Sequence, residues 1–183
     1  TIWGASGNNT IEGNDGEDIL YGGGEDDNID GGADDDQIYS GGALTAEYLY
    51  GGTGADFIYA DFSGSGVFYI YGGAGNDTIQ GSSFLVNVIS GDEGNDVIYG
   101  GSESDNISGG ADNDTISGGG GADSIYGDGG NDTLYAVDVS TSSDSYSDIL
   151  NGGDGDDDLW GDLVEDTFIG GADNDWVNGV NIG

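Results

Sequence analysis

A nine-residue repeat governs this sequence from end to end. Gly109–Tyr135 contains three consecutive copies, Gly109–Ser117, Gly118–Tyr126 and Gly127–Tyr135, which follow the pattern G-G-x-G-x-D-x-U-x, where U is a large aliphatic residue. Some eighteen units in the same phase account for most of the 183 residues. A repeat of this length predicts a solenoid, because each unit can bury its apolar residue only against neighbouring units.

Each position of the repeat has a physical role. Glycine at positions 1, 2 and 4 permits the backbone conformations of a tight turn and lets carbonyl oxygens converge on an ion. Aspartate at position 6 adds a carboxylate, and such hard oxygen ligands suit Ca²⁺. Positions 7 to 9 alternate outward, inward and outward, as a short strand does, and the inward residue is the aliphatic one. Two units then make one turn of the solenoid.

This pattern resembles the RTX (repeats-in-toxin) family of calcium-binding nonapeptide repeats. The resemblance implies an all-β, right-handed parallel β-roll, a β-solenoid with about two short strands per 18-residue turn, formed by residues 1–183 as a single domain. It implies Ca²⁺ as the cofactor, with calcium ions as the main partners. It also implies a secreted, extracellular or cell-surface protein that leaves the cell without a signal peptide and folds in external calcium.

The composition points the same way. The chain has 37 acidic residues and no Lys, Arg or His. Such charge normally indicates disorder, so the regular Ile and Leu spacing predicts order that depends on a cation. Nucleic acid and membrane insertion are not expected for this acidic sequence, which has no long apolar segment. Without His, Cys, Lys or Arg to activate a nucleophile or stabilise charge, we do not expect an enzyme.

The units differ in a regular way when they are numbered from Thr1–Trp3. All four units of unusual length are even: Ser40–Tyr50, Ala60–Tyr71, Gly81–Ser90 and Ala136–Asn151. Alternate units stack on the same edge of a two-unit turn, so we expect a regular odd edge and a variable even edge. Position 6 of the odd edge is Asp18, Asp36, Asp56, Asp77, Asp96, Asp114, Asp132, Asp157 and Asp175. The even edge, interrupted by its loops, has Asn9, Asp27, Glu47, Asn87, Asp105, Asp123, Asp148 and Asp166.

The RTX resemblance implies a ligand set for each ion. In that family an ion lies between stacked turns and is held by both aspartates, by carbonyls of positions 2 and 4 of one turn, and by carbonyls of positions 1 and 3 of the next. Candidate ligands on the odd edge are Asn14, Gly16, Asp18, Gly31, Gly32, Ala33, Asp34, Asp36, Gly51, Gly52, Thr53, Gly54, Asp56, Gly72, Gly73, Ala74, Gly75, Asp77, Gly91, Asp92, Glu93, Gly94, Asp96, Gly109, Gly110, Ala111, Asp112, Asp114, Gly127, Asp128, Gly129, Gly130, Asp132, Gly152, Gly153, Asp154, Gly155, Asp157, Gly170, Ala172 and Asp175. On the even edge they are Asp27, Asp105 and Asp123, of which only Asp105 and Asp123 belong to adjacent regular units.

One aliphatic or aromatic residue per strand forms the expected core: Ile2, Ile11, Leu20, Ile29, Ile38, Leu49, Ile58, Ile70, Ile79, Ile89, Ile98, Ile107, Ile116, Ile125, Leu134, Leu150, Leu159, Phe168 and Val177. Two outward rows have alternative interpretations. The aromatic row at position 9 of the odd units, broken by Gln80 and Ser117, favours cross-strand stacking over a glycan-docking face. The threonines Thr78, Thr115 and Thr133 form too irregular an array to favour an ice-binding face.

From these patterns we expect a secreted, calcium-stiffened rod that forms a filament, a surface layer or an adhesin stalk. One alternative is an RTX segment that assists secretion and folding of a larger toxin or hydrolase. Another is an ice- or glycan-binding adhesive module. Thr1–Trp3 and Gly179–Gly183 are both partial units, so we also expect copies to stack end to end, with Gly179–Gly183 beginning a further unit that the next copy completes.

Overall fold

The computed structural model describes residues 1–60, 64–137, 146–161, 166–177 and 180–181. Their regular structure is entirely β-strand, so no helix in this part of the chain could span a membrane. Strands formed by the odd units are β1 (Ile2–Trp3), β3 (Ile19–Tyr21), β5 (Gln37–Tyr39), β7 (Phe57–Tyr59), β9 (Thr78–Gln80), β11 (Val97–Gly101), β13 (Thr115–Gly119), β15 (Thr133–Val137), β17 (Asp158–Trp160) and β19 (Trp176–Val177). Strands formed by the even units are β2 (Thr10–Asp15), β4 (Asn28–Ala33), β6 (Ala46–Thr53), β8 (Val67–Ala74), β10 (Asn87–Glu93), β12 (Asn106–Ala111), β14 (Ser124–Gly129), β16 (Ile149–Asp154) and β18 (Thr167–Ala172).

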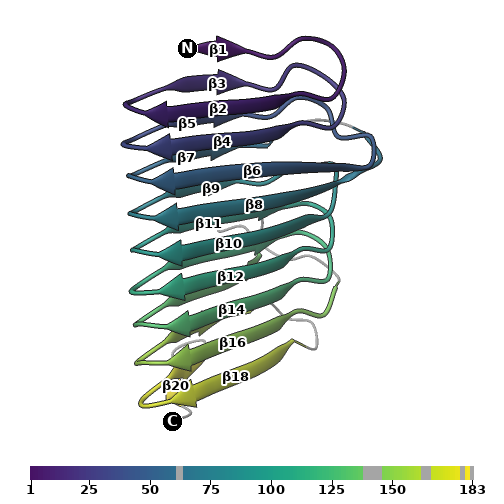
Figure 1. Cartoon of the computed structure of the whole chain (residues 1–183). Helices are drawn as coiled ribbons and strands as arrows, with labels where there is room; N and C mark the ends of the chain where they lie inside the picture. Colours follow the sequence, from purple (N-terminus) through teal and green to yellow (C-terminus); the bar gives the residue numbers. More distant parts are fainter. Residues whose placement is uncertain (61–63, 138–145, 162–165, 178–179, 182–183) are drawn as a thin grey trace.

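The strands form two facing parallel sheets, as the repeat predicts. The odd-numbered strands pair in sequence order from β1 to β19, and the even-numbered strands pair from β2 to β18. Successive strands alternate between the sheets, so the chain winds as a solenoid with two strands per turn (Figure 1). The nearer sheet runs to the left and the farther one to the right as the chain descends, which is a right-handed winding (Figure 1). The predicted β-roll is confirmed.

The register places equivalent repeat positions above one another. Ile98 pairs with Ile116, and Ile116 with Leu134, so position 8 always meets position 8. Each even strand also continues into positions 1 to 3 of the odd unit that follows, as in the pairing of Gly110 with Asp128. The odd turns are short and uniform and lie at the left edge of Figure 1, whereas the described parts of the even units turn at the right edge. This arrangement confirms the predicted difference between the two edges.

The predicted residues form a single-file core. Every one from Ile11 to Leu159 is buried, and Phe168 and Val177 pack against the core while partly exposed. Ile2 is 37 % exposed, so its prediction as a buried core residue is wrong, because β1 is the outermost strand of its sheet. The even units add buried residues that the repeat does not identify: Ala43, Ala60, Phe68, Leu85 and Ala136.

Aromatic side chains stack along the outer faces of both sheets. The ring centroids of Trp3 and Tyr21 are 3.8 Å apart, and those of Tyr21 and Tyr39 are 4.8 Å apart. On the other sheet, Tyr48 stacks on Tyr69 at 5.0 Å. Stacked pairs of this kind stabilise neighbouring strands. The contacts support the structural interpretation of the aromatic row.

The last described strand departs from the repeat. β20 (Val180–Asn181) pairs antiparallel with β19 and extends the sheet of odd-numbered strands. The chain thus reverses direction after Val177, so the prediction that a further unit begins here is wrong. Gly179 and residues 182–183 lie outside the described residues. The expectation that the next copy completes this partial unit loses its basis.

Candidate metal centre

The odd turns share one backbone conformation. Positions 2 and 4 have positive φ in all nine of the regular odd units, including 111° at Gly32 and 139° at Gly54. Where glycine is absent, the residue is Asn or Asp, which tolerate this left-handed conformation better than other residues do. These positions are Asn14, Asp34, Asp92, Asp112, Asp128 and Asp173, with φ between 71° and 78°. Replacing glycine at these positions therefore preserves the turn.

The position-6 aspartates form a continuous hydrogen-bonded ladder along the odd edge. The backbone N–H of each aspartate donates to Oδ1 of the aspartate one turn further along, for example Asp36 to Asp56 at 2.7 Å and Asp96 to Asp114 at 2.8 Å. The ladder runs without a break from Asp18 to Asp175. One carboxylate oxygen of each side chain from Asp36 onward is thereby held by the backbone N–H of the preceding odd turn.

The second carboxylate oxygen has no such partner. Oδ2 of each odd-edge aspartate from Asp36 to Asp175 is buried without a hydrogen bond. At Asp36, Asp56, Asp77, Asp96, Asp132 and Asp157 this oxygen lies beside the position-1 glycine, close to a carbonyl oxygen of the next odd turn. A Cβ built on Gly51 would lie 2.5 Å from Asp56 Oδ2 and 2.3 Å from the Gly72 oxygen. A buried ionised oxygen facing another oxygen requires a cation or a proton, so the chain's own atoms fit calcium here.

Burial raises the pKa of the odd-edge carboxyl groups from Asp36 to Asp157. Removal from water raises the pKa of Asp56, Asp77 and Asp96 to about 6, against the opposing effect of the backbone N–H that each carboxylate accepts. The same cause raises the pKa of Asp114 to about 7. Without metal, the folded arrangement therefore favours protonated carboxyl groups at pH values where an exposed Asp is ionised.

Acid is expected to substitute in part for calcium. Because the folded pKa values of about 6 to 7 lie above the ordinary value of 3.8, proton uptake favours the folded state. That stabilisation is complete below about pH 3.8 and is lost as the pH rises through 6 to 7. A chelated sample that lacks strand signal in circular dichroism at pH 7.5 should gain it reversibly as the pH falls to about 4. A signal that stays unchanged over this range, with light scattering excluding aggregates, would contradict the prediction.

The predicted position-3 carbonyls already take part in backbone hydrogen bonds. The N–H of Gly54 donates to the Ala74 oxygen at 2.8 Å, and the N–H of Gly75 donates to the Glu93 oxygen at 2.7 Å. A carbonyl has two lone pairs, so one remains for an ion. The structure thus brings these carbonyls to the predicted edge and gives them a second role in holding turns together.

A second hydrogen-bonded ladder, formed by position 5, lies beside the first, and the repeat pattern did not predict it. At position 5 the N–H of Asn95 donates to Asn76 Oδ1 at 2.8 Å, and the N–H of Asn131 donates to Asn113 Oδ1 at 2.7 Å. The series consists of Asn76, Asn95, Asn113, Asn131, Asp156 and Asn174. Its donors point toward the preceding turn, opposite to the position-6 ladder. The recurrence of Asn at position 5 was the signal that could have found it.

The even edge carries a ladder of its own in two segments. The N–H of Asn9 donates to Asp27 Oδ1 at 2.8 Å, and a second series runs through Asn87, Asp105, Asp123, Asp148 and Asp166. The seven-residue insertion, whose residues 138–145 lie outside the described part, does not break this series, because Asp123 N–H reaches Asp148 Oδ1 at 2.8 Å. The gap between the two segments contains Glu47, whose Oε1 accepts the Gly41 N–H at 2.9 Å, and Phe68, which occupies the aligned position between Glu47 and Asn87 and is fully buried. The ladder thus extends beyond Asp105 and Asp123, the pair from adjacent regular units, to residues of irregular units on either side.

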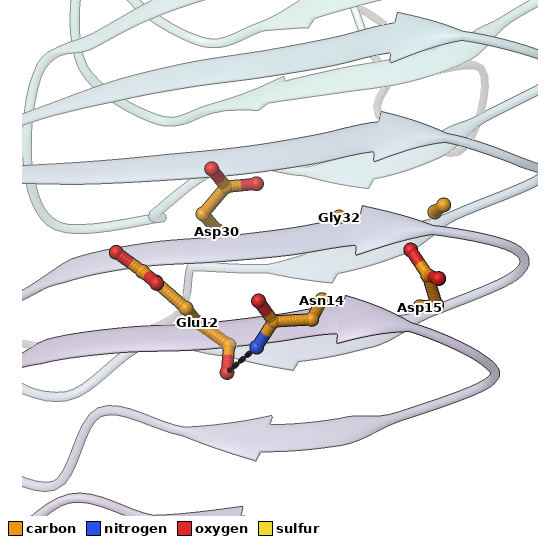
Figure 2. Close-up of a pocket in the computed structure, with 6 residues that line it drawn as sticks. Glu12, Asn14, Asp15, Asp30 and Gly32 are labelled. Carbon is orange, nitrogen blue, oxygen red and sulfur yellow. Dashed lines mark hydrogen bonds between the residues drawn. The ribbon is translucent and has the colours of Figure 1, made fainter.

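A shallow hollow lies on the outer face of the sheet of even-numbered strands. Figure 2 shows Glu12 and Asp30 on adjacent strands beside Asn14. The side-chain amide of Asn14 donates to the backbone carbonyl oxygen of Glu12 at 3.3 Å. Asp15 and Gly32 complete the labelled lining. These acidic groups point outward, away from the buried ladder, so the hollow is distinct from the spaces between stacked turns.

The geometry of the odd edge defines a class of protein. Stacked turns, buried aspartates with unpartnered oxygens and converging carbonyls together describe a calcium-binding β-solenoid. The family model for the RTX calcium-binding nonapeptide repeat matches residues 12–43, 41–62, 69–83, 86–116, 99–134, 143–168 and 165–179, which is more than half of the chain. The chain therefore belongs to the RTX calcium-binding nonapeptide-repeat family. The search of curated proteins found no match.

Proposed function

We propose that the chain is a secreted structural rod whose stiffness outside the cell comes from calcium between its stacked turns. The observation that carries this proposal is the row of buried, unpartnered Oδ2 atoms along the odd edge. Each position-6 aspartate would contribute to the gaps on both of its sides, together with carbonyls of the neighbouring turns. When bound, calcium supplies positive charge to this row, and the fold supplies the spacing. A structural role is also supported by the lack of basic, Cys and His side chains.

Loss of one odd-edge aspartate should raise the calcium concentration needed for folding. Asp96→Ala removes a carboxylate shared by two gaps, and we expect the folding midpoint to rise about tenfold, or about 1.4 kcal/mol. Asp158→Ala is the matched control, because it removes the same charge from an exposed, outward position on β17. Calcium titrations followed by circular dichroism compare the two variants. Equal midpoints would show that charge, and not ligation, is what Asp96 contributes.

The even edge should respond as well. The sequence alone predicts that Asp148→Ala matters clearly less than Asp96→Ala, because an insertion precedes Asp148. The structure buries Asp148 in the second even ladder, so we expect a measurable effect that is still smaller than that of Asp96. The even ladder is shorter and is divided at Phe68.

Two further roles are compatible with the same rod. As a segment of a larger secreted toxin or hydrolase, it would fold on meeting external calcium and so assist export. As a subunit, it would associate end to end through the outermost strands of its sheets, where backbone groups lack a neighbouring strand. Sedimentation in millimolar calcium tests association, and a monomer at high concentration would remove it. The stacked tyrosines favour neither a glycan nor an ice ligand.

A further inference from the structure

Asparagine replaces aspartate at position 6 in two even turns, at Asn9 and Asn87. In each case the side-chain nitrogen lies where oxygens of two successive even turns converge. Asn87 Nδ2 donates to four oxygens: Ser82 O at 3.1 Å, Leu85 O at 2.9 Å, Gly100 O at 3.3 Å and Asp105 Oδ1 at 2.9 Å. Asn9 Nδ2 donates to Ala5 O at 3.1 Å, Gly7 O at 2.5 Å and Asp27 Oδ1 at 3.0 Å.

The surroundings fix the orientation of the Asn87 amide. Its Oδ1 accepts the backbone N–H of Ser82 at 2.9 Å, which leaves the nitrogen facing the oxygens. An amide nitrogen has two hydrogens, so four acceptors exceed its donor capacity. Three carbonyls and a carboxylate around one point are a set that suits a hard cation. Asn87 is fully buried, so its amide is shielded from bulk solvent.

The turn that follows shows what the same backbone does with aspartate. A Cβ built on Gly81 would lie 2.3 Å from the Gly100 oxygen and 3.1 Å from Asn87 Nδ2. One turn later, a Cβ built on Gly100 would lie 2.4 Å from the Gly118 oxygen and 2.7 Å from Asp105 Oδ2. Nδ2 and Oδ2 thus occupy corresponding places. The donor at Asn87 satisfies its surroundings, whereas the buried Asp105 Oδ2 has no hydrogen-bond partner.

We propose that the side-chain amides of Asn9 and Asn87 take the place of calcium, so that the gaps from Asn9 to Asp27 and from Asn87 to Asp105 close without an ion. The inference rests on the proposed function, because it assigns which gaps of the same edge take metal. Each asparagine begins one segment of the even ladder, and Asn87 directly follows the interruption at Phe68. The first two turns of each segment are therefore joined by an amide hydrogen bond that needs no metal.

Restoring the carboxylate should create a calcium site. Asn87→Asp is expected to raise the number of calcium ions bound per chain by one, and Asn9→Asp with Asn87→Asp by two. Isothermal titration calorimetry and direct metal analysis after equilibrium dialysis give the count. Asn106→Asp is the control, because it adds the same charge at an exposed neighbouring position and should leave the count unchanged. A folded Asn87→Asp variant with the wild-type count would overturn the inference.

The reverse change provides a second test that does not depend on Asn87→Asp folding. Asp105→Asn should lose one ion yet keep its strand signal, because the new amide meets the corresponding carbonyls. Asp105→Ala should lose the ion and fold less readily. Equal folding of these two variants would contradict the inference. A wild-type chain that binds no calcium would overturn the proposed function, whereas a calcium-binding wild type with an unchanged count in Asn87→Asp would overturn this inference alone.

Discussion

Removal of calcium with excess chelator at pH 7.5 is expected to abolish the strand signal of the chain. The sequence carries 37 acidic side chains and no basic ones, and the fold stacks the position-6 aspartates in a buried row. Eight ions in the gaps between nine odd turns would bring sixteen positive charges to that row. Without them, ionised carboxylates face one another in a core too narrow to compensate.

Circular dichroism with and without calcium measures this effect, and readdition of calcium should restore the signal. Magnesium at equal concentration is the control. Mg²⁺ is a smaller ion that requires octahedral coordination and retains several of its water ligands. It should restore less structure than calcium does. A strand signal that persists in chelator at pH 7.5 would contradict the calcium requirement, and with it the role of the unpartnered oxygens.

Alanine at a position-1 glycine should be among the most damaging single changes. A Cβ on Gly127 would lie 2.3 Å from Asp132 Oδ2 and 2.5 Å from the Gly152 oxygen. Both atoms belong to the proposed calcium gap, so neither can move without changing the ligand geometry. Crowding of this kind costs about 1–3 kcal/mol. We expect the variant also to bind fewer ions, since Asp132 contributes to two gaps.

The same turn contains its own control. A Cβ on Gly129 would meet only the Gly110 oxygen, at 3.8 Å, which is an ordinary contact. Gly129 also lies outside the positive-φ positions, so alanine is conformationally acceptable there. Gly129→Ala should change stability by no more than about 0.5 kcal/mol. Calcium-dependent thermal unfolding compares the two variants, and equal losses would refute the steric role assigned to position 1.

The sequence predicted most of this fold because one local rule repeats. Position 8 fills the core, position 6 carries the carboxylate, and the period of two units separates the regular edge from the variable one. These features depend on neighbours at fixed spacing, which a repeat reveals directly. The exposure of Ile2 follows from its place on the outermost strand β1. Exposure of this kind depends on the position of a unit in the solenoid and not on the sequence of the unit.

Departures from the repeat were less predictable, because each depends on contacts between residues of different units and not on the spacing within one unit. The twelve-residue unit Ala60–Tyr71 has no acid at position 6, and only the structure shows that Phe68 occupies the aligned place. The long insertion before Asp148 suggested a broken edge, yet the ladder closes around it. The reversal at Val180–Asn181 has no signal in the nonapeptide pattern. The donor role of Asn87 depends on four oxygens that come from separate segments of the chain. Their convergence on one point is visible only in the folded structure.

The position-6 ladder links the order of one turn to the order of its neighbour. The peptide N–H of Asp77 holds Asp96 Oδ1, and the peptide N–H of Asp96 holds Asp114 Oδ1. A turn that becomes ordered therefore presets the carboxylate of the next, as in a one-dimensional lattice with nearest-neighbour coupling. Such a lattice converts a gradual rise in calcium into a steep threshold. Its interior turns switch together, and its outermost turns, each with one neighbour, are the first to release as the ion becomes scarce.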